Sequence, residues 1–173
     1  MQQMNLDLIE EKKFSKLRSL LDSMNPADIA TILVEVDEKD LPIVFRILPK
    51  ELAAEVFSYL ESDMQQFLIE KLSDTELKIV LDELYLDDTV DIIEEMPANI
   101  AKRILSQSDA NTRKKINQLL AYPEDSAGSI MTTEYIDLKK NMTVDDAFDR
   151  IRKIGFDTET IYTCYVIDRS RHL

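Results

Sequence analysis

The stretch LPIVFRILPKELAAEVFSYL, residues 41–60, contains two helical patterns in succession. In each half, apolar residues recur at intervals of three and four positions, the spacing that places them on one face of an α-helix. The first set is Leu41, Val44, Phe45 and Leu48, and the second is Ala53, Val56, Phe57 and Leu60. The stretch therefore predicts a hairpin of two short helices.

The same apolar pattern recurs along the chain with a period of about 24 residues. One column reads Leu20, Val44, Leu68, Ile92 and Ile116, and a second reads Met24, Leu48, Leu72, Met96 and Leu120. A hairpin of this size is too small to bury its own apolar stripe, so neighbouring hairpins must stack on one another. The predicted fold class is mainly α, with an α-solenoid of short helical hairpins over residues 5–121.

Two further columns mark the expected helix starts. Good N-cap residues occupy one column, which reads Ser15, Lys39, Asp63, Asp87 and Asn111, with the lysine as the exception. The second helix of each hairpin is expected to open near Asn25, Pro49, Ser73 and Pro97. Proline suits this place because the first turn of a helix has no internal partner for the N–H that proline lacks.

The repeat stops at AYPEDSAGSIMTTEYIDL, residues 121–138, where Gly128 and Pro123 indicate a connection over residues 122–134. Beyond it, EYIDL and ETIYTCYVID are typical of strands. Between them Thr143 and Asp146 form a capping-box pattern that starts a helix ending at Gly155. Strand, helix and strand in residues 135–173 predict an α/β unit that is too small to be a complete domain.

Composition and residue types argue against catalysis and against nucleic-acid binding. The only histidine, His172, lies next to the last residue, and Cys164 is expected to be a small buried residue of a strand. Two glycines cannot form a glycine-rich phosphate loop. The net charge of −13, from 34 acidic and 21 basic residues, repels phosphate backbones and attracts cations. No apolar run approaches the roughly 18–20 residues of a membrane span, so this region is expected to be soluble.

The stretch DELYLDDTVDIIEEMP, residues 82–97, carries seven carboxylates and no base. Asp87 has a simple interpretation as an N-cap, and a charge run is often only a solvated face. Asp91 is less simple, because its column holds Ile43 and Phe67 in earlier repeats, and helical spacing places it one turn after Asp87. Oxygen-only sites suit Mg²⁺, which needs one or two carboxylates directly.

The runs YPEDSAGSIMTTEY, MTVDDAFDRIRK and ETIYTCYVID together resemble the junction between the N-terminal helical domain and the first CBS domain of MgtE-type magnesium transporters. The helical repeats are similar to that family too, so the resemblance covers nearly the whole chain. It implies that residues 135–173 are the first part of a CBS domain, and that the region is a non-enzymatic regulator on the cytoplasmic side of a multi-pass transporter in the cell membrane.

The resemblance further implies a homodimer in which bound Mg²⁺ holds a compact, closed state together with the remaining CBS and transmembrane domains. Carried over by motif, the metal ligands would be Glu55 in AAEVF, and Asp87 and Asp91 in LDDTVD. The acidic partners expected outside these residues are not assigned.

Two other functions remain open at this point. Short hairpins beginning with NPADIATIL, residues 25–33, also resemble the middle domain of a flagellar motor switch protein, which would make the chain an interaction scaffold. Pairs of CBS modules often bind adenine nucleotides, but a single truncated module does not define that pocket. The connection at residues 122–134 and the α/β unit favour the transporter interpretation over the scaffold.

Overall fold

The computed structural model describes residues 8–9, 11–123, 125–155 and 158–173. The helices and strands bounded within these residues are α2 (Phe14–Leu21), α3 (Pro26–Val34), α4 (Leu41–Arg46), α5 (Lys50–Ser58), α6 (Ser62–Lys71), α7 (Asp74–Glu83), α8 (Leu86–Glu95), α9 (Ala98–Gln107), α10 (Ala110–Leu119), β1 (Tyr135–Lys139), α11 (Val144–Ile154) and β2 (Thr160–Ile167). The fold is mainly helical, as predicted. The predicted start of the helical domain at residue 5 lies outside the described residues.

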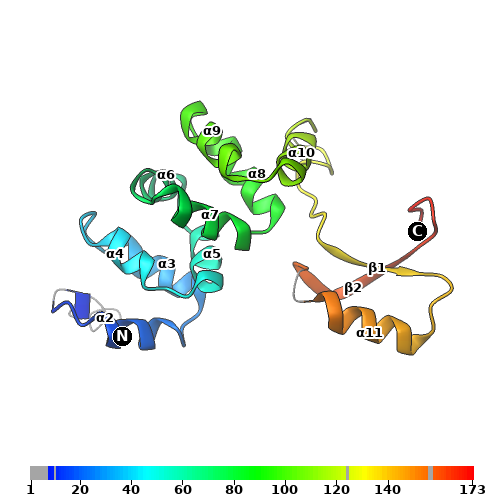
Figure 1. The fold of residues 1–173 in the computed structure, drawn as a ribbon, viewed down its shortest axis with the longest axis horizontal. Helices are drawn as coiled ribbons and strands as arrows, with labels where there is room; N and C mark the ends of the chain where they lie inside the picture. Colours follow the sequence, from blue (N-terminus) through cyan, green and yellow to red (C-terminus); the bar gives the residue numbers. More distant parts are fainter. Residues whose placement is uncertain (1–7, 10, 124, 156–157) are drawn as a thin grey trace.

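Helices α2 to α10 form a curved stack (Figure 1). In one row α3 packs on α5, α5 on α7 and α7 on α9, while in the other α4 packs on α6, α6 on α8 and α8 on α10. Helices α3, α5, α7 and α9 begin at regular intervals along the chain, at Pro26, Lys50, Asp74 and Ala98. Each hairpin therefore covers the apolar face that its predecessor leaves open.

One apolar core runs through the stack from Ile9 to Leu119. Phe57, Leu68 and Ile104, which belong to three successive hairpins, are fully buried in it. Burying such a side chain contributes roughly 1.5–3 kcal/mol, so packing between hairpins is the main stabilising term for helices this short.

The predicted N-cap column does not match the observed caps. The N-caps of α6, α8 and α10 are Glu61, Tyr85 and Asp109, so the predicted Asp63, Asp87 and Asn111 are second residues of their helices. The reason is physical: small polar and acidic residues suit the whole first turn, where N–H groups and the helix dipole face them.

The other predicted helix starts have mixed outcomes. Ser15 follows the start of α2, whose N-cap is Lys13, and the N-cap of α4 is Asp40 rather than Lys39. The second column is confirmed, because all four of its members are N-caps: Asn25, Pro49, Ser73 and Pro97.

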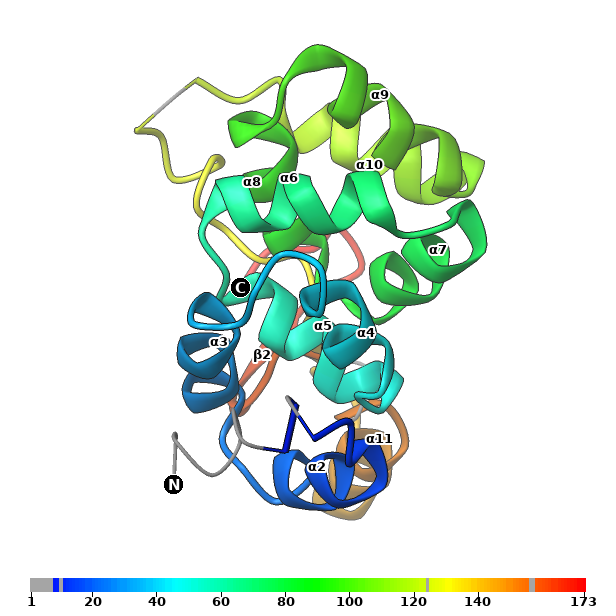
Figure 2. The same cartoon turned by 90° about the vertical axis from the view of Figure 1, so that its left-hand side faces the viewer.

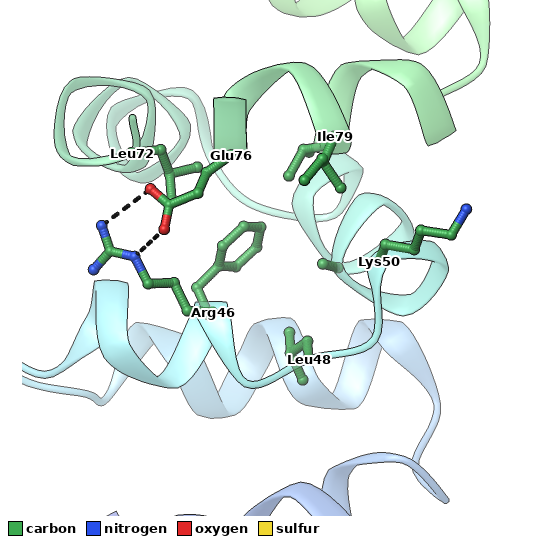
Figure 3. Close-up of a pocket in the computed structure, with 9 residues that line it drawn as sticks. Arg46, Leu48, Lys50, Leu72, Glu76 and Ile79 are labelled. Carbon is green, nitrogen blue, oxygen red and sulfur yellow. Dashed lines mark hydrogen bonds and ion pairs between the residues drawn. The ribbon is translucent and has the colours of Figure 1, made fainter. Parts of the chain in front are cut away.

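An ion pair joins α4 to α7 at the edge of a small apolar cavity (Figure 3). Arg46 Nε donates to Glu76 Oε1 at 2.7 Å, and this hydrogen bond is the first cause that lowers the pKa of Glu76 to about 2. The cavity, about 160 Å³, is lined by apolar side chains that include Leu48, Leu72 and Ile79. It lies between stacked hairpins, and its charged rim is already neutralised within the chain.

Arg103 of α9 has a similar bridging role one hairpin further along. Its guanidinium donates to the carbonyl oxygens of Ile69 and Leu72, the latter at 2.7 Å, and to Asp74 Oδ1 at 2.8 Å. The last carbonyls of a helix have no intrahelical donor, so Arg103 satisfies the end of α6 while holding the start of α7.

The α/β unit consists of the parallel strands β1 and β2 and the crossing helix α11, to the right of the stack in Figure 1 and behind it in Figure 2. As predicted, α11 begins with a capping box of Thr143 and Asp146 and ends at Gly155. No residue of α11 is buried, and Val144 and Phe148 are 72% and 52% exposed. Cys164 lies in β2 but is half-buried, which corrects its expected burial.

The described part of residues 120–134 contains no helix or strand. Gly128 lies against the ring of Tyr122 there, and a Cβ at this glycine would stand 2.4 Å from the ring carbons. The close approach explains why one of the two glycines occurs in this connection.

Candidate functional site

The α/β unit contacts the helical stack at the start of α8. The backbone N–H of Leu86 donates to Glu134 Oε2 at 2.8 Å, and the hydroxyl of Tyr85 lies 3.5 Å from the carbonyl oxygen of Thr158. Glu134 directly precedes β1, and Thr158 stands shortly before β2. The amino-terminal edge of the two-stranded sheet therefore faces α8.

Carboxylates from four segments surround Tyr85 at this contact. Burial is the first cause that raises the pKa of the Tyr85 hydroxyl, and the nearby charges of Glu55, Glu134, Glu159 and Asp88 raise it further. We call these four residues together with Asp87 the interdomain carboxylate cluster. Among the described residues, none of the five forms an ion pair with a base. The negative charge at this contact is thus uncompensated.

Asp88 is the most perturbed member of the cluster. Burial, followed by the charges of Asp87, Asp91 and Glu159, raises the pKa of Asp88 to about 6. A carboxyl with such a pKa is held in surroundings that disfavour its charged form, through loss of water and through repulsion. A cation close to Asp88 would replace this repulsion with attraction.

Asp87, the residue directly before Asp88, has a different environment. Its Oδ1 atom is buried and has no hydrogen-bond partner among the described residues. Burial, followed by the charge of Glu159, raises the pKa of Asp87 more than contacts with the backbone N–H groups of Asp87 and Asp88 lower it. A buried carboxylate oxygen without a donor is costly, and a bound cation or water would remove that cost.

Two cavities meet at Asp88. One, of about 490 Å³ between α5 and α8, is lined by residues that include Glu55, Tyr85 and Glu159. The other, of about 360 Å³, is lined by residues that include Asp91 and Glu95. Asp88 lines both, so it connects the cavity of Glu55 to that of Asp91.

The three predicted ligands are therefore only partly brought together. Glu55 and Asp91 are exposed and line adjacent cavities, and Asp87 lines neither. Sequence spacing paired Asp91 with Asp87. In the structure burial raises the pKa of Asp91, and the charge that raises it further is that of Glu95. The aspartate that shares the cavity of Asp91 is Asp88.

Sequence reasoning missed Asp88, Glu134 and Glu159. Asp88 belongs to the charge run and could have been found by testing both helical phases of α8. Glu134 and Glu159 gave no such signal, because each is a single acid that precedes a strand and lies far along the chain from α8. Only the fold brings Glu134 to the backbone N–H of Leu86.

The donor chemistry of the cluster fits a hard divalent cation, since every side-chain donor is a carboxylate oxygen. In the described part of the chain, however, no three acidic, histidine or cysteine side chains converge closely enough to hold one ion. Mg²⁺ retains several waters and is commonly bound through one or two carboxylates. The described residues thus present facing carboxylates but no closed cage for an ion.

The family model for the MgtE intracellular N domain matches residues 24–125, more than half of the chain. The chain belongs to the MgtE intracellular N domain family. The magnesium transporter MgtE of Thermus thermophilus is 33% identical over 171 residues, covering 96% of this chain and 38% of that protein. MgtE of Bacillus subtilis is 29% identical over 166 residues, covering 96% of this chain and 37% of that protein. The chain thus spans less than two fifths of these MgtE relatives.

Two solved structures have the same fold as this MgtE-family chain. The cytosolic domain of the Mg²⁺ channel MgtE in complex with ATP superimposes with a TM-score of 0.88 at 32% identity, covering 98% of this chain and 70% of that one. The soluble part of a magnesium transporter gives a TM-score of 0.88 at 26% identity, covering 99% and 68%. No helix among the described residues is long and apolar enough to cross a membrane.

Proposed function

We propose that this chain is the Mg²⁺-responsive cytosolic region of an MgtE-type magnesium transporter, and that Mg²⁺ binding favours a compact arrangement of its two parts. The observation that carries the proposal is the interdomain carboxylate cluster, in which acids of the helical stack face acids of the α/β unit without a compensating base. The magnesium transporters and the Mg²⁺ channel among its relatives support the choice of ion.

The mechanism follows from the sign of the electrostatic energy. Facing carboxylates favour separation of the two parts, and a divalent ion between them turns that repulsion into attraction. A cation shifts the equilibrium only through its different affinity for the compact and separated states. The chain's own residues would bind and orient the hydrated ion, with Glu55, Asp87 and Asp91 as proposed ligands and Asp88 connecting two cavities.

The proposal includes a domain organisation. Residues 5–121 form an α-solenoid of repeated hairpins, residues 122–134 a connection, and residues 135–173 the first part of a CBS domain. In the longer protein, remaining CBS and transmembrane domains would follow, the assembly would be a homodimer in the cell membrane, and the compact state would close the transport path. The regularly spaced helix starts and the parallel β1–α11–β2 unit support this organisation.

Limited proteolysis at the connection of residues 122–134 tests the proposal. In the wild-type chain, added Mg²⁺ should slow cleavage there, because the compact state restricts access to the connection. The double variant Asp87→Ala, Asp91→Ala should require about tenfold more Mg²⁺ for equal protection, which corresponds to about 1.4 kcal/mol. Glu94→Ala is the matched control, since Glu94 is an exposed acid of α8 outside both cavities. Equal Mg²⁺ dependence in the double variant and the wild type would contradict the proposal.

A second candidate function is adenine-nucleotide binding, which the ATP complex of the solved relative favours. A cavity of about 630 Å³ lies at the carboxyl ends of β1 and β2, and Lys139, Lys140 and Arg169 line it. Carboxyl ends of parallel strands are common ligand sites, and Lys140 and Arg169 offer charges to phosphate groups, whereas Lys139 pairs with Asp137 at 2.6 Å. Calorimetry with ATP should give binding that Lys140→Gln with Arg169→Gln weakens. No heat of binding to the wild type would exclude this function for the chain.

A further inference from the structure

Helix α8 has no N-terminal cap of its own. Its N-cap residue is Tyr85, whose side chain accepts no hydrogen bond from the first turn. The preceding helix α7 is different, because Ser73 accepts the N–H of Glu76 in a capping box. The first N–H groups of any helix lack backbone acceptors within the helix, and Tyr85 provides none for the N–H of Leu86 at the start of α8.

The α/β unit supplies that partner. Glu134 lies 48 residues after Leu86 in the chain, and its Oε2 accepts the Leu86 N–H at 2.8 Å. Leu86 is the first residue of α8. We propose that Glu134 is the cap of α8, and that this bond is a positioning contact that sets the α/β unit against the helical stack. A carboxylate in this place is favoured both by the hydrogen bond and by the helix dipole.

The same carboxylate also contributes to the repulsion at the contact. Glu134 is among the charges that raise the pKa values of Asp87 and Asp88 in the first turn of α8. One side chain thus has two opposed effects, because its oxygen attracts the α/β unit to α8 and its charge repels it. A cation in the cluster would remove the repulsion and leave the cap, and for this role the inference rests on the proposed function.

Neighbouring contacts hold the backbone of Glu134 in place next to the strands. The backbone N–H of Glu159 donates to the carbonyl oxygen of Glu134 at 3.1 Å, which joins the two segments that precede the strands. The N–H of Glu134 has a local partner, since it donates to Thr132 Oγ1 at 3.1 Å. The backbone of Glu134 is therefore held on both sides while its side chain reaches α8.

Two substitutions of Glu134 separate the cap from the charge. Glu134→Gln removes the charge but retains an amide oxygen that can accept the Leu86 N–H, whereas Glu134→Ala removes both. The readout is amide hydrogen exchange at Leu86, measured by NMR on the full chain without Mg²⁺. We expect exchange in Glu134→Ala to be about fivefold faster than in the wild type, as loss of a cap predicts. Glu134→Gln should exchange at the wild-type rate or more slowly, because repulsion is relieved.

Matched variants of Glu159 provide the control for charge alone. Its charge acts on Asp87, but the Leu86 N–H bonds to Glu134 instead, so Glu159→Ala and Glu159→Gln should both slow exchange at Leu86 or leave it unchanged. Exchange at Val90 and Ile93, in the buried middle of α8, checks that the helix stays folded. If Leu86 exchanges at the same rate in Glu134→Ala and Glu134→Gln, the capping role of Glu134 is wrong.

The result is independent of whether Mg²⁺ acts on the chain. The four variants are compared without the ion, and a second series with Mg²⁺ tests the proposed function separately. A wild type whose exchange ignores Mg²⁺, together with different rates in the two Glu134 variants, would reject the proposed function and keep the cap. If exchange in the wild type responds to Mg²⁺ but Leu86 exchanges at the same rate in Glu134→Ala and Glu134→Gln, the proposed function is kept and the cap is rejected.

Discussion

Helices α7 and α8 are consecutive, equally long and carry two acids each in the first turn, yet these first turns have opposite electrostatics. At α7, Glu76 pairs with Arg46 at 2.7 Å and Asp74 with Arg103 at 2.8 Å. At α8, Asp87 and Asp88 have no base within the described residues and face Glu134 and Glu159 instead. The first arrangement joins hairpins of one stack, and the second stands where two parts of the chain meet.

The comparison shows that acidic residues at a helix start do not have one role. Both pairs suit the helix dipole, but only the α7 pair is neutralised by neighbours. The whole chain shows the same uneven distribution of charge. Residues 135–173 contain seven acids and seven bases, so the net charge of −13 belongs to residues 1–134. Part of that unmatched charge lies at the contact with the α/β unit.

The largest expected effect comes from removing Arg103, the base of α9 that contacts the start of α7. Arg103→Ala should lower the free energy of unfolding by about 3 kcal/mol, because two carbonyls at the end of α6 lose their donor and Asp74 loses its partner. Urea unfolding measures the change, with Lys102→Ala as control, because Lys102 is an exposed base of α9 next to Arg103. A loss no larger than that of the control would mean that α7 does not depend on its bases.

Matching substitutions at the two helix starts should have opposite signs. Glu76→Gln should destabilise the chain by about 1 kcal/mol, because a partly exposed ion pair and a capping box are weakened. Asp88→Asn should stabilise the metal-free chain by roughly 0.5 kcal/mol, since repulsion in a solvent-screened site is relieved. Thermal unfolding of both variants without Mg²⁺ checks this. Destabilisation by both would remove the distinction between the two helices.

The smallest expected effect is on pH dependence. The pKa of Asp88 is raised to about 6 from its ordinary 3.8, so the native state binds a proton more readily than the unfolded chain between these values. Lowering the pH from 7 to 5 without Mg²⁺ should therefore raise the free energy of unfolding of the wild type relative to Asp88→Asn by about 0.3 kcal/mol.

The contribution of Glu76 in α7 to the free energy of unfolding should change with pH in the opposite direction and in a lower pH range. The pKa of Glu76 is lowered to about 2, so its contribution is present above its ordinary 4.5 and is lost as the pH falls toward 2. Urea midpoints measured from pH 7 to pH 2 on the wild type, Asp88→Asn and Glu76→Gln resolve the two ranges. If the urea midpoints of the wild type and Asp88→Asn change in parallel with pH, the pKa of Asp88 is not raised.

Much of the local structure was predictable from the sequence. The apolar spacing located the helices, the β-formers located both strands, and Thr143 with Asp146 gave the capping box of α11. The position of the first-turn acids was predicted less well, because Asp87 is a good N-cap residue and an equally good second residue of a helix. Local patterns do not distinguish such neighbouring positions when the free-energy difference between them is small.

The sequence by itself determined which segments are helices and strands and that residues 82–97 concentrate negative charge, because hydrophobic periodicity and charge are properties of residues near one another in the chain. Only the tertiary structure decided which charges meet. Asp88 joins two cavities, and Glu134 caps a helix that begins 48 residues earlier. Electrostatic and hydrogen-bond energies depend on distance in space, and for residues this far apart in the chain that distance is set by the packing of the hairpins.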